Sequence, residues 1–148
     1  MKAAAVRLFM GFLSVCAVAG CATTGGQTSA KSVIEAKFAA VNRHSLDDIV
    51  ALYAPDATVT APDFCSPRRG HADVRRTYQA LFTAFPDIAV EVQEYLQEGD
   101  RVAVRFVVRG SLPGRTFAVP IMNFFSVRNG VIVSDEGMFD NGGRKCSA

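Results

Sequence analysis

The chain of 148 residues has no tryptophan, only 2 histidines and a net charge of only +2. It also lacks the glycine-rich phosphate loops of the Rossmann and Walker types, which argues against a nucleotide-binding fold. Neither histidine lies at metal-ligand spacing from another histidine or a cysteine, so we expect no metal and no cofactor. The cysteines include no CxxC pair, which argues against redox catalysis.

The remaining composition is that of a globular protein. Hydrophobic residues make up 49% of the chain and charged residues 20%, which distinguishes it from a disordered segment. The length corresponds to one ordinary domain. Phenylalanine is frequent, with 11 copies, so we expect a core rich in phenylalanine.

The first twenty residues have the pattern of an export signal. Lys2 and Arg7 precede an apolar stretch that is shorter than the roughly 18 residues a spanning helix needs. The run Val18-Ala19-Gly20-Cys21 resembles the lipobox of bacterial lipoproteins, in which the cysteine is lipidated and becomes the first residue of the mature chain. A plain cleavable signal is the alternative, because residues 17–19 read Ala-Val-Ala.

We favour the lipobox because the segment that follows is rich in Gly, Ser and Thr and predicts a flexible tether over residues 21–30. Residues 31–140 then form the folded domain, and residues 141–148 form a polar tail. Ala22 stands where lipoproteins of the inner membrane typically carry Asp. The resemblance therefore implies a bacterial envelope protein that faces the periplasm and is anchored to the outer membrane through a lipid at Cys21.

Removal of the signal leaves 14 basic and 14 acidic residues. A neutral domain gives no electrostatic reason for binding nucleic acid, and nucleic acid is not expected as a partner.

Cys65 and Cys146 remain as an even pair in an oxidising compartment, so we predict that they form a disulfide. Two free thiols are the alternative.

Three helices are expected in the first half of the domain. Apolar residues at helical spacing predict one helix over residues 31–42. Ser45 is the predicted N-cap of a second helix, which contains Tyr53 on its apolar face and ends at Pro55. A short strand over residues 57–61 and a loop over 63–70 lead to a third helix over residues 71–85.

Four strands are expected in the second half, over residues 88–96, 101–109, 116–127 and 131–139. Val102, Val104, Phe106 and Val108 share one face of the second of these strands. Helices on one side of a curved antiparallel or mixed sheet make an α+β fold. We expect a cone-shaped, cystatin-like α+β roll, closed by its three N-terminal helices, with a cavity for a small ligand.

Several runs of residues resemble a known superfamily. Residues 46–59, LDDIVALYAPDATV, are similar to the second helix and first strand of nuclear-transport-factor-2-like proteins. Phe85-Pro86-Asp87 is similar to SnoaL-like proteins, and Val119-Pro120-Ile121-Met122-Asn123-Phe124 to the pocket strand of ketosteroid isomerases. The resemblance covers residues 33–140 and implies the cone-shaped fold. It implies no single activity, because this fold hosts many unrelated ones.

The resemblance also implies that the best-known chemistry of this superfamily is lost. The general base of the isomerases matches Ala61, their oxyanion-binding tyrosine matches Lys37, and their protonated aspartate matches Met122. Neither Ala61 nor Met122 can transfer a proton, so ketosteroid isomerisation is not expected. The His-x-Asp of SnoaL-like cyclases matches Asp135 and Gly137, so that arrangement is broken as well.

Asp135 is the candidate catalytic residue. With a period of two it shares the cavity face of the last strand with Gly137 and Phe139. An apolar cavity raises the pKa of a carboxyl group and makes it a usable proton acceptor or donor near neutral pH. In the alternative, Asp135 lies solvated at the cavity mouth and pairs with a basic residue. A register slip by one residue would put Glu136 in its place.

Tyr53 and Tyr78 match pocket tyrosines of some isomerases and could donate hydrogen bonds to a ligand. The alternative is that they are core tyrosines whose hydroxyls bond to the backbone. Lys37 could offer its ammonium to an oxyanion or pair with Asp135. More commonly, a lone lysine on an amphipathic helix extends outward to solvent, which we favour here.

Met122 and Phe124 are expected to face the cavity, and Asn123 to face away. Ile132 and Met138 then lie on the outer face of the sheet, which needs a cover. The resemblance implies a homodimer interface there, and a monomer covered by a loop or tail is the alternative. The expected pocket consists of Lys37, Tyr53, Ala61, Tyr78, Phe106, Met122, Phe124, Gly137 and Phe139.

Three functions follow from these expectations. The favoured one is an envelope-anchored SnoaL-like domain that binds a small hydrophobic molecule in a conical pocket without chemistry. The second is an enzyme of the isomerase, cyclase or lyase type with Asp135 as general base. The third is an interaction module that uses the exposed sheet face. A buried Asp135 within hydrogen-bond reach of a pocket tyrosine or lysine favours the enzyme, and an exposed Asp135 favours binding alone.

Overall fold

The structure, a computed structural model, describes residues 29–146. The export signal over residues 1–20, the lipidation site Cys21 and the tether up to residue 28 lie outside this part and remain predictions. Within residues 29–146 the chain forms three helices and six strands, which are α1 (Ala30–Asn42), α2 (Leu46–Ala51), β1 (Tyr53–Thr60), β2 (Arg68–Arg69), α3 (Gly70–Ala84), β3 (Ala89–Glu98), β4 (Arg101–Leu112), β5 (Arg115–Arg128) and β6 (Val131–Met138).

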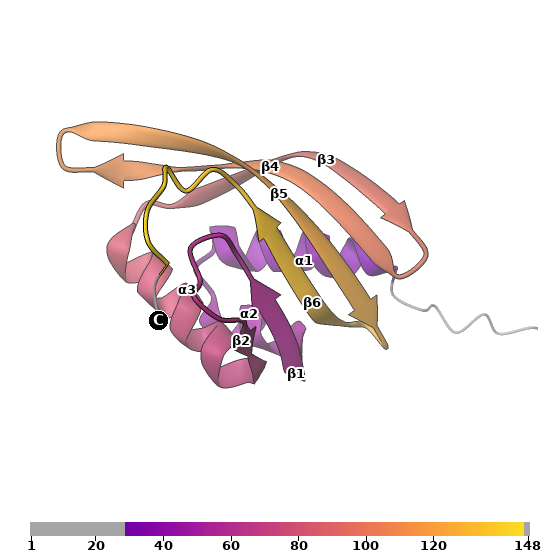
Figure 1. Cartoon of the computed structure of the whole chain (residues 1–148). Coiled ribbons are helices and arrows are strands. Elements are labelled where there is room, and N and C mark those ends of the chain that lie inside the picture. Colours follow the sequence, from indigo (N-terminus) through magenta and orange to yellow (C-terminus); the bar gives the residue numbers. More distant parts are fainter. Residues whose placement is uncertain (1–28, 147–148) are drawn as a thin grey trace, which may run out of the picture.

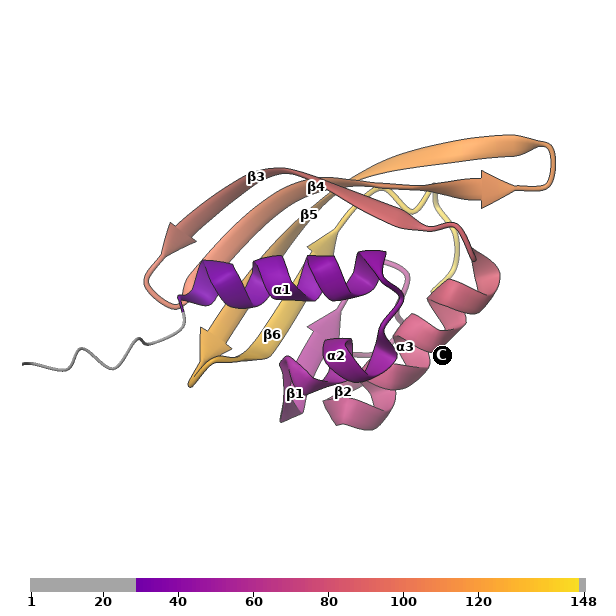
Figure 2. The same ribbon diagram turned by 180° about the vertical axis from the view of Figure 1, so that it is seen from behind.

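The strands form one mixed sheet in the order β2-β1-β6-β5-β4-β3. Only the pairing of β1 with β6 is parallel among these neighbours. The sheet is strongly curved, and α1 lies across its concave face, which we call the inner face (Figure 1 and Figure 2). The α+β class with a curved mixed sheet is confirmed. None of the helices in residues 29–146 is long and apolar enough to cross a bilayer.

Helix α1 begins earlier than the predicted tether allows. The Ser29 side chain caps the helix by accepting a hydrogen bond from the Ser32 amide, and Ala30 is already buried in the core. The tether expected over residues 21–30 is therefore wrong at its C-terminal end. Capping and burial of the first helical residue attach the chain to the domain at this point.

Strand β1 replaces the end of the predicted second helix. Helix α2 ends at Ala51, and Tyr53 is the first residue of β1 rather than a helical residue. Pro55 lies exposed within β1, where the pairing with β6 is irregular between Tyr53 and Thr58. A proline without an N–H is tolerated at such an irregularity. Residues 68–69, expected in a loop, pair with β1 as β2.

A tight turn over Pro113-Gly114 fixes the register of β4 and β5, because Leu112 before the turn pairs with Arg115 after it. This register puts Asn123 opposite Val104, whose side chain is buried on the inner face. Met122 and Phe124 therefore lie on the outer face, and their predicted place in the pocket is wrong. The expectation that Asn123 faces away is wrong for the same reason.

Strand β6 contains an extra residue. Ile132 pairs with Val127, but Ser134 pairs with Ser126, so Val133 forms a β-bulge between them. The bulge changes the alternation of the strand and turns both Ile132 and Asp135 inward, where they are 0% and 3% exposed. The prediction of Ile132 on the outer face is therefore wrong.

Candidate active site

A cavity of about 630 Å³ lies between the inner face of the sheet and helices α1 and α3. Its walls are largely apolar and include Phe38, Val74, Leu81, Phe106, Val108 and Ile121. An apolar hollow of this size with a few polar groups is the usual form of a small-molecule site. The polar groups of interest are gathered at one place on the wall.

Most of the predicted pocket residues line this cavity. They are Lys37, Ala61, Tyr78, Phe106, Gly137 and Phe139. The candidate catalytic residue Asp135 lines it as well. Tyr53 lies next to them in the core and contacts Asp135 rather than the cavity wall. Met122 is 41% exposed on the outer face, and Phe124 lies on that face as well, so these two residues belong to no part of the site.

Asp135 is held by a set of buried donors. The Tyr53 hydroxyl donates to its Oδ2 at 2.6 Å, and the Asn123 amide donates to its Oδ1 at 2.6 Å. The Lys37 Nζ lies 3.8 Å from Oδ2, and the side chains of both ionic partners are only 4% exposed. Hydrogen bonds and an opposite charge offset the cost of burying a carboxylate.

Lys37 points into the protein rather than out to solvent. It follows Val33 and Ile34 on the buried stripe of α1, and its ammonium lies 4.3 Å from the ring centre of Phe38 and 4.8 Å from that of Phe125. Burial acts to lower the pKa of Lys37, but the electrostatic influence of Tyr78 and Asp135 outweighs it and leaves this pKa above its ordinary value. Lys37 is therefore a cation at neutral pH.

Tyr53 supports Asp135 as a neutral donor. Burial first, and then the charge of Asp135, raise the pKa of the Tyr53 phenol well above its ordinary value. The Tyr53 carbonyl accepts a hydrogen bond from the His71 ring at 2.8 Å, which ties the start of β1 to α3. The Tyr78 hydroxyl lies 3.4 Å from the Tyr53 hydroxyl and extends the polar cluster to the cavity wall.

Asn123 is the site residue that the sequence-based prediction missed. It is 8% exposed, lines the cavity and bonds to Asp135. The signal for it was present in the sequence, because the Pro113-Gly114 turn and the clean alternation of β4 together set the face of every residue on β5.

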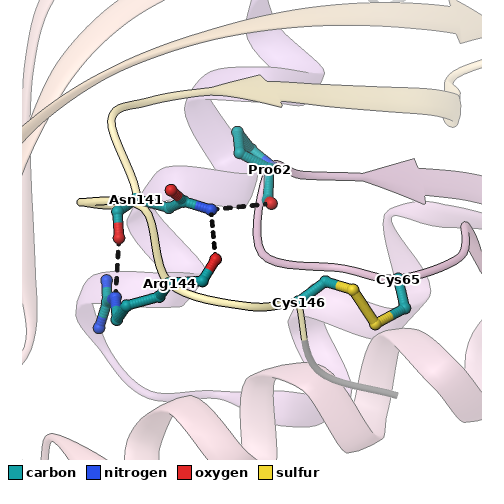
Figure 3. The surroundings of a disulfide bond; sticks show 5 residues. All are labelled: Pro62, Cys65, Asn141, Arg144 and Cys146. Carbon is teal, nitrogen blue, oxygen red and sulfur yellow. Dashed lines mark hydrogen bonds between the residues drawn. A yellow bond between two sulfur atoms is a disulfide. The ribbon is translucent and has the colours of Figure 1, made fainter.

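The wall next to Ala61 is made by the segment that connects β1 to β2. Asp63 and Phe64 of this segment line the cavity, as does Arg68 at the start of β2. A disulfide joins Cys65 of the segment to Cys146 of the tail. Figure 3 shows the tail lying beside this segment, with the Asn141 amide donating to the Pro62 carbonyl at 3.1 Å. The polar tail is thus fastened to a wall of the cavity.

The described part of the chain, residues 29–146, contains no group of three or more His, Cys, Asp or Glu side chains arranged to hold a metal ion. What the site does offer is a buried carboxylate beside a buried ammonium, a phenol and an amide. A carboxylate has about four acceptor positions, so donors from Tyr53 and Asn123 leave it capacity to accept a proton from a molecule in the cavity. This set of groups can support proton transfer.

Comparison with known proteins assigns the chain to a family. The model of the SnoaL-like domain matches residues 34–134. The wild-type structure of IdmH from Streptomyces antibioticus, assigned as a polyketide cyclase, superposes with a TM-score of 0.70 at 29% identity and covers 76% of this chain and 93% of its own. A loop-truncated variant of IdmH is 31% identical, with a TM-score of 0.70, and covers 77% of this chain and 94% of its own.

A more distant structure shows the same fold. A protein from Catenulispora acidiphila with a ketosteroid isomerase-like fold, solved in complex with trimethylamine, superposes with a TM-score of 0.68 at 21% identity. It covers 74% of this chain and 85% of its own. The fold is thus shared with a protein of low sequence identity.

Proposed function

The chain belongs to the SnoaL-like domain family, and from this premise we propose that it catalyses proton transfer on a small, largely apolar carbonyl compound, as a cyclase or isomerase does. The observation that carries the proposal is the burial of Asp135, 3% exposed, on the cavity wall within 2.6 Å of a tyrosine hydroxyl and 3.8 Å of an ammonium. By the criterion set above, this geometry favours an enzyme over binding alone.

The proposed step begins with the substrate carbonyl beside Lys37 and Tyr78. Asp135 removes a proton from the carbon next to the carbonyl, and the electron pair of that C–H bond moves to form an enolate. The ammonium and the phenol stabilise the negative oxygen, which is the usual role of donors aimed at developing charge. In an isomerisation, Asp135 then returns its proton to another carbon and the carbonyl forms again. In a cyclisation, the enolate carbon attacks a second carbonyl of the same molecule and closes a ring. The π electrons of that carbonyl move to its oxygen, and Asp135 gives its proton to this oxygen.

The apolar walls support this proposal. They exclude water from the enolate and bind the hydrocarbon part of the substrate. IdmH, the relative assigned as a polyketide cyclase, shares the fold at 29% identity over most of both chains. The alanine at position 61, which matches the general base of the isomerases, does not oppose the proposal, because Asp135 supplies the base from β6. Met122 lies on the outer face, so its match to an isomerase acid has no bearing on the site.

The test is the exchange of carbon-bound hydrogen in 1-tetralone, an apolar ketone, during incubation with the protein in deuterated water. We expect the wild-type protein to accelerate exchange next to the carbonyl by roughly 100-fold or more over buffer, the usual contribution of general acid–base catalysis. Asp135→Asn should abolish this acceleration. Glu136→Gln is the matched control, because Glu136 is the exposed neighbour on the same strand. Equal exchange by the wild type and Asp135→Asn would contradict the proposal.

We also propose that the protein is exported and anchored through lipid at Cys21. The run of residues 18–21 supports this, and so does the Cys65–Cys146 disulfide, since oxidising compartments preserve such bonds. Expressed in a Gram-negative host, the protein should sediment with membranes and give an N-terminal peptide that carries acyl chains. Cys21→Ser should lose the acyl mass, and an unmodified Cys21 in the wild type would refute the anchor.

A second copy of the chain is the proposed cover for the outer sheet face. Met122 and Met138 are paired across β5 and β6 and are 41% and 53% exposed, which makes an apolar patch. Met138→Glu should convert a dimer to a monomer in sedimentation velocity. Gln79→Glu, which adds the same charge at an exposed position of α3, should leave the dimer intact. A wild-type monomer would end this proposal.

A further inference from the structure

The carbonyl oxygen of the Asn123 side chain is buried without a hydrogen-bond partner among the described residues. The amide nitrogen of the same group is already bonded to Asp135 at 2.6 Å, which fixes the orientation of the amide. Asn123 lines the cavity and is 8% exposed. Buried polar atoms in native proteins almost always have partners, so this acceptor indicates a group that occupies the cavity.

Gly137 provides the space in front of this oxygen. It pairs with Asn123 across β5 and β6 and also lines the cavity. A Cβ atom at position 137 would lie 3.3 Å from Asn123 Oδ1 and 3.5 Å from the Thr60 carbonyl oxygen. Gly137 is not among the glycines with positive φ, so its backbone does not require glycine. The absence of a side chain there leaves room beside Asn123 Oδ1.

We propose that Asn123 Oδ1 and the space beside Gly137 form a subsite for a hydroxyl group of the ligand. The inference rests on the proposed function and narrows its substrate class to hydroxylated carbonyl compounds. The ligand hydroxyl donates to Asn123 Oδ1, and its carbonyl lies at Lys37 and Tyr78. The apolar walls hold the carbon framework between the two oxygens.

The charges of the cavity favour a neutral hydroxyl over an ammonium as the donor. The lining contains Lys37, Arg68 and Arg76 against Asp63 and Asp135. The Asp135 carboxylate already has an ammonium 3.8 Å away. A cationic ligand would therefore add positive charge to a cavity that has no excess of negative charge.

The test compares the binding of 1-tetralone with that of its 5-, 6-, 7- and 8-hydroxy derivatives by isothermal titration calorimetry. At least one hydroxylated compound should bind the wild-type protein roughly tenfold more tightly than the parent ketone, the usual effect of satisfying a buried polar atom. Gly137→Ala should remove this preference, because the added methyl group occupies the subsite.

Methoxy derivatives give a control that needs no protein variant. They keep the oxygen atom but cannot donate a hydrogen bond, so each should bind the wild-type protein no better than the parent ketone. A methoxy compound that matches its hydroxylated counterpart, or a preference that survives in Gly137→Ala, would overturn the subsite. Deuterium exchange of 1-tetralone separates the two proposals: exchange without hydroxyl preference rejects only the subsite, and preference without exchange rejects only the catalytic function.

Discussion

Replacing Asp135 by Asn is expected to lower the free energy of unfolding by roughly 3–5 kcal/mol, because it leaves a buried ammonium without its counterion. Lys37 lies against the rings of Phe38 and Phe125 and is only 4% exposed, so hydration compensates only in part for the loss of the carboxylate. Lys37→Met should destabilise the protein by a similar amount, since it leaves the carboxylate unpaired. Both losses are large against a typical total stability of about 5–15 kcal/mol.

The double variant Lys37→Met with Asp135→Asn tests the interaction between the two charges most specifically. It removes both charges together, so it should be more stable than either single variant, as found for buried ion pairs replaced by neutral residues. Urea denaturation of the four proteins gives the coupling energy directly. Additive losses, with the double variant less stable than both single variants, would show that the two side chains do not interact.

Two comparisons test whether the loss of stability comes from the buried ion pair. Arg43→Met breaks an exposed ion pair with Asp48 at 3.1 Å and should lower the free energy of unfolding by less than about 1 kcal/mol.

The pH dependence of stability provides the second comparison. The pKa of Lys37 lies above its ordinary value of 10.5, so the stabilisation of the folded protein by the charged lysine is complete below that pH. It is lost as the pH rises through the folded-state pKa. The stability difference between wild type and Lys37→Met should therefore stay constant from neutral pH to about 10 and shrink only above it.

Removal of the Cys65–Cys146 disulfide is the second change with a large expected effect. The bond links residues 81 apart in the sequence, and the chain-entropy model assigns a loop of this length a stabilisation of roughly 4 kcal/mol. Cys65→Ala with Cys146→Ala should lose about this amount in urea denaturation. The affinity for apolar ketones should fall as well, because Phe64 and Asp63 beside Cys65 line the cavity.

Reduction of the wild-type protein provides an independent check. A reductant should lower the stability of the wild type to that of the double cysteine variant and leave the variant unchanged. Each single replacement should cost as much as the double one, since either one removes the bond. A double variant within about 1 kcal/mol of the wild type would contradict the entropic estimate. Loss of stability with unchanged ketone affinity would show that the fastened wall does not shape the cavity.

The main elements of the fold can be predicted from residue patterns in the sequence. The apolar stripe of α1, the alternation of β4 and the tight turns predict helices on one face of a curved sheet, and the structure has this arrangement. The burial of Lys37 follows from the same stripe, because Lys37 is three and four residues from Ile34 and Val33. The general tendency of lysines to reach solvent led to the opposite expectation.

The place of Asn123 could also have been predicted. Counting from the two-residue Pro113-Gly114 turn puts Asn123 opposite Val104, which is plainly a core residue. The resemblance to isomerases instead matched Met122 to a catalytic position and put the strand one residue out of phase. Because side chains alternate in a strand, an error of one residue reverses every inward and outward assignment on it.

The inward orientation of Asp135 depends on a feature that local patterns do not encode. Without the bulge at Val133, the Asn129-Gly130 turn would put Asp135 opposite Phe124, which lies on the outer face. The period-two pattern gave the correct face for Asp135 and the wrong one for Ile132, because it contained no bulge. The extra residue falls at Val133 in the pairing of β6 with β5.

Native mass spectrometry with 1-tetralone tests most directly whether the cavity holds a small molecule against the Asp135 cluster. Ala61→Trp fills the cavity beside the cluster, whereas Ala118→Trp adds the same ring at an exposed position of β5. We predict that the wild-type protein and Ala118→Trp carry the ketone and that Ala61→Trp does not. Equal binding by all three proteins would contradict the account, because the molecule would then bind elsewhere.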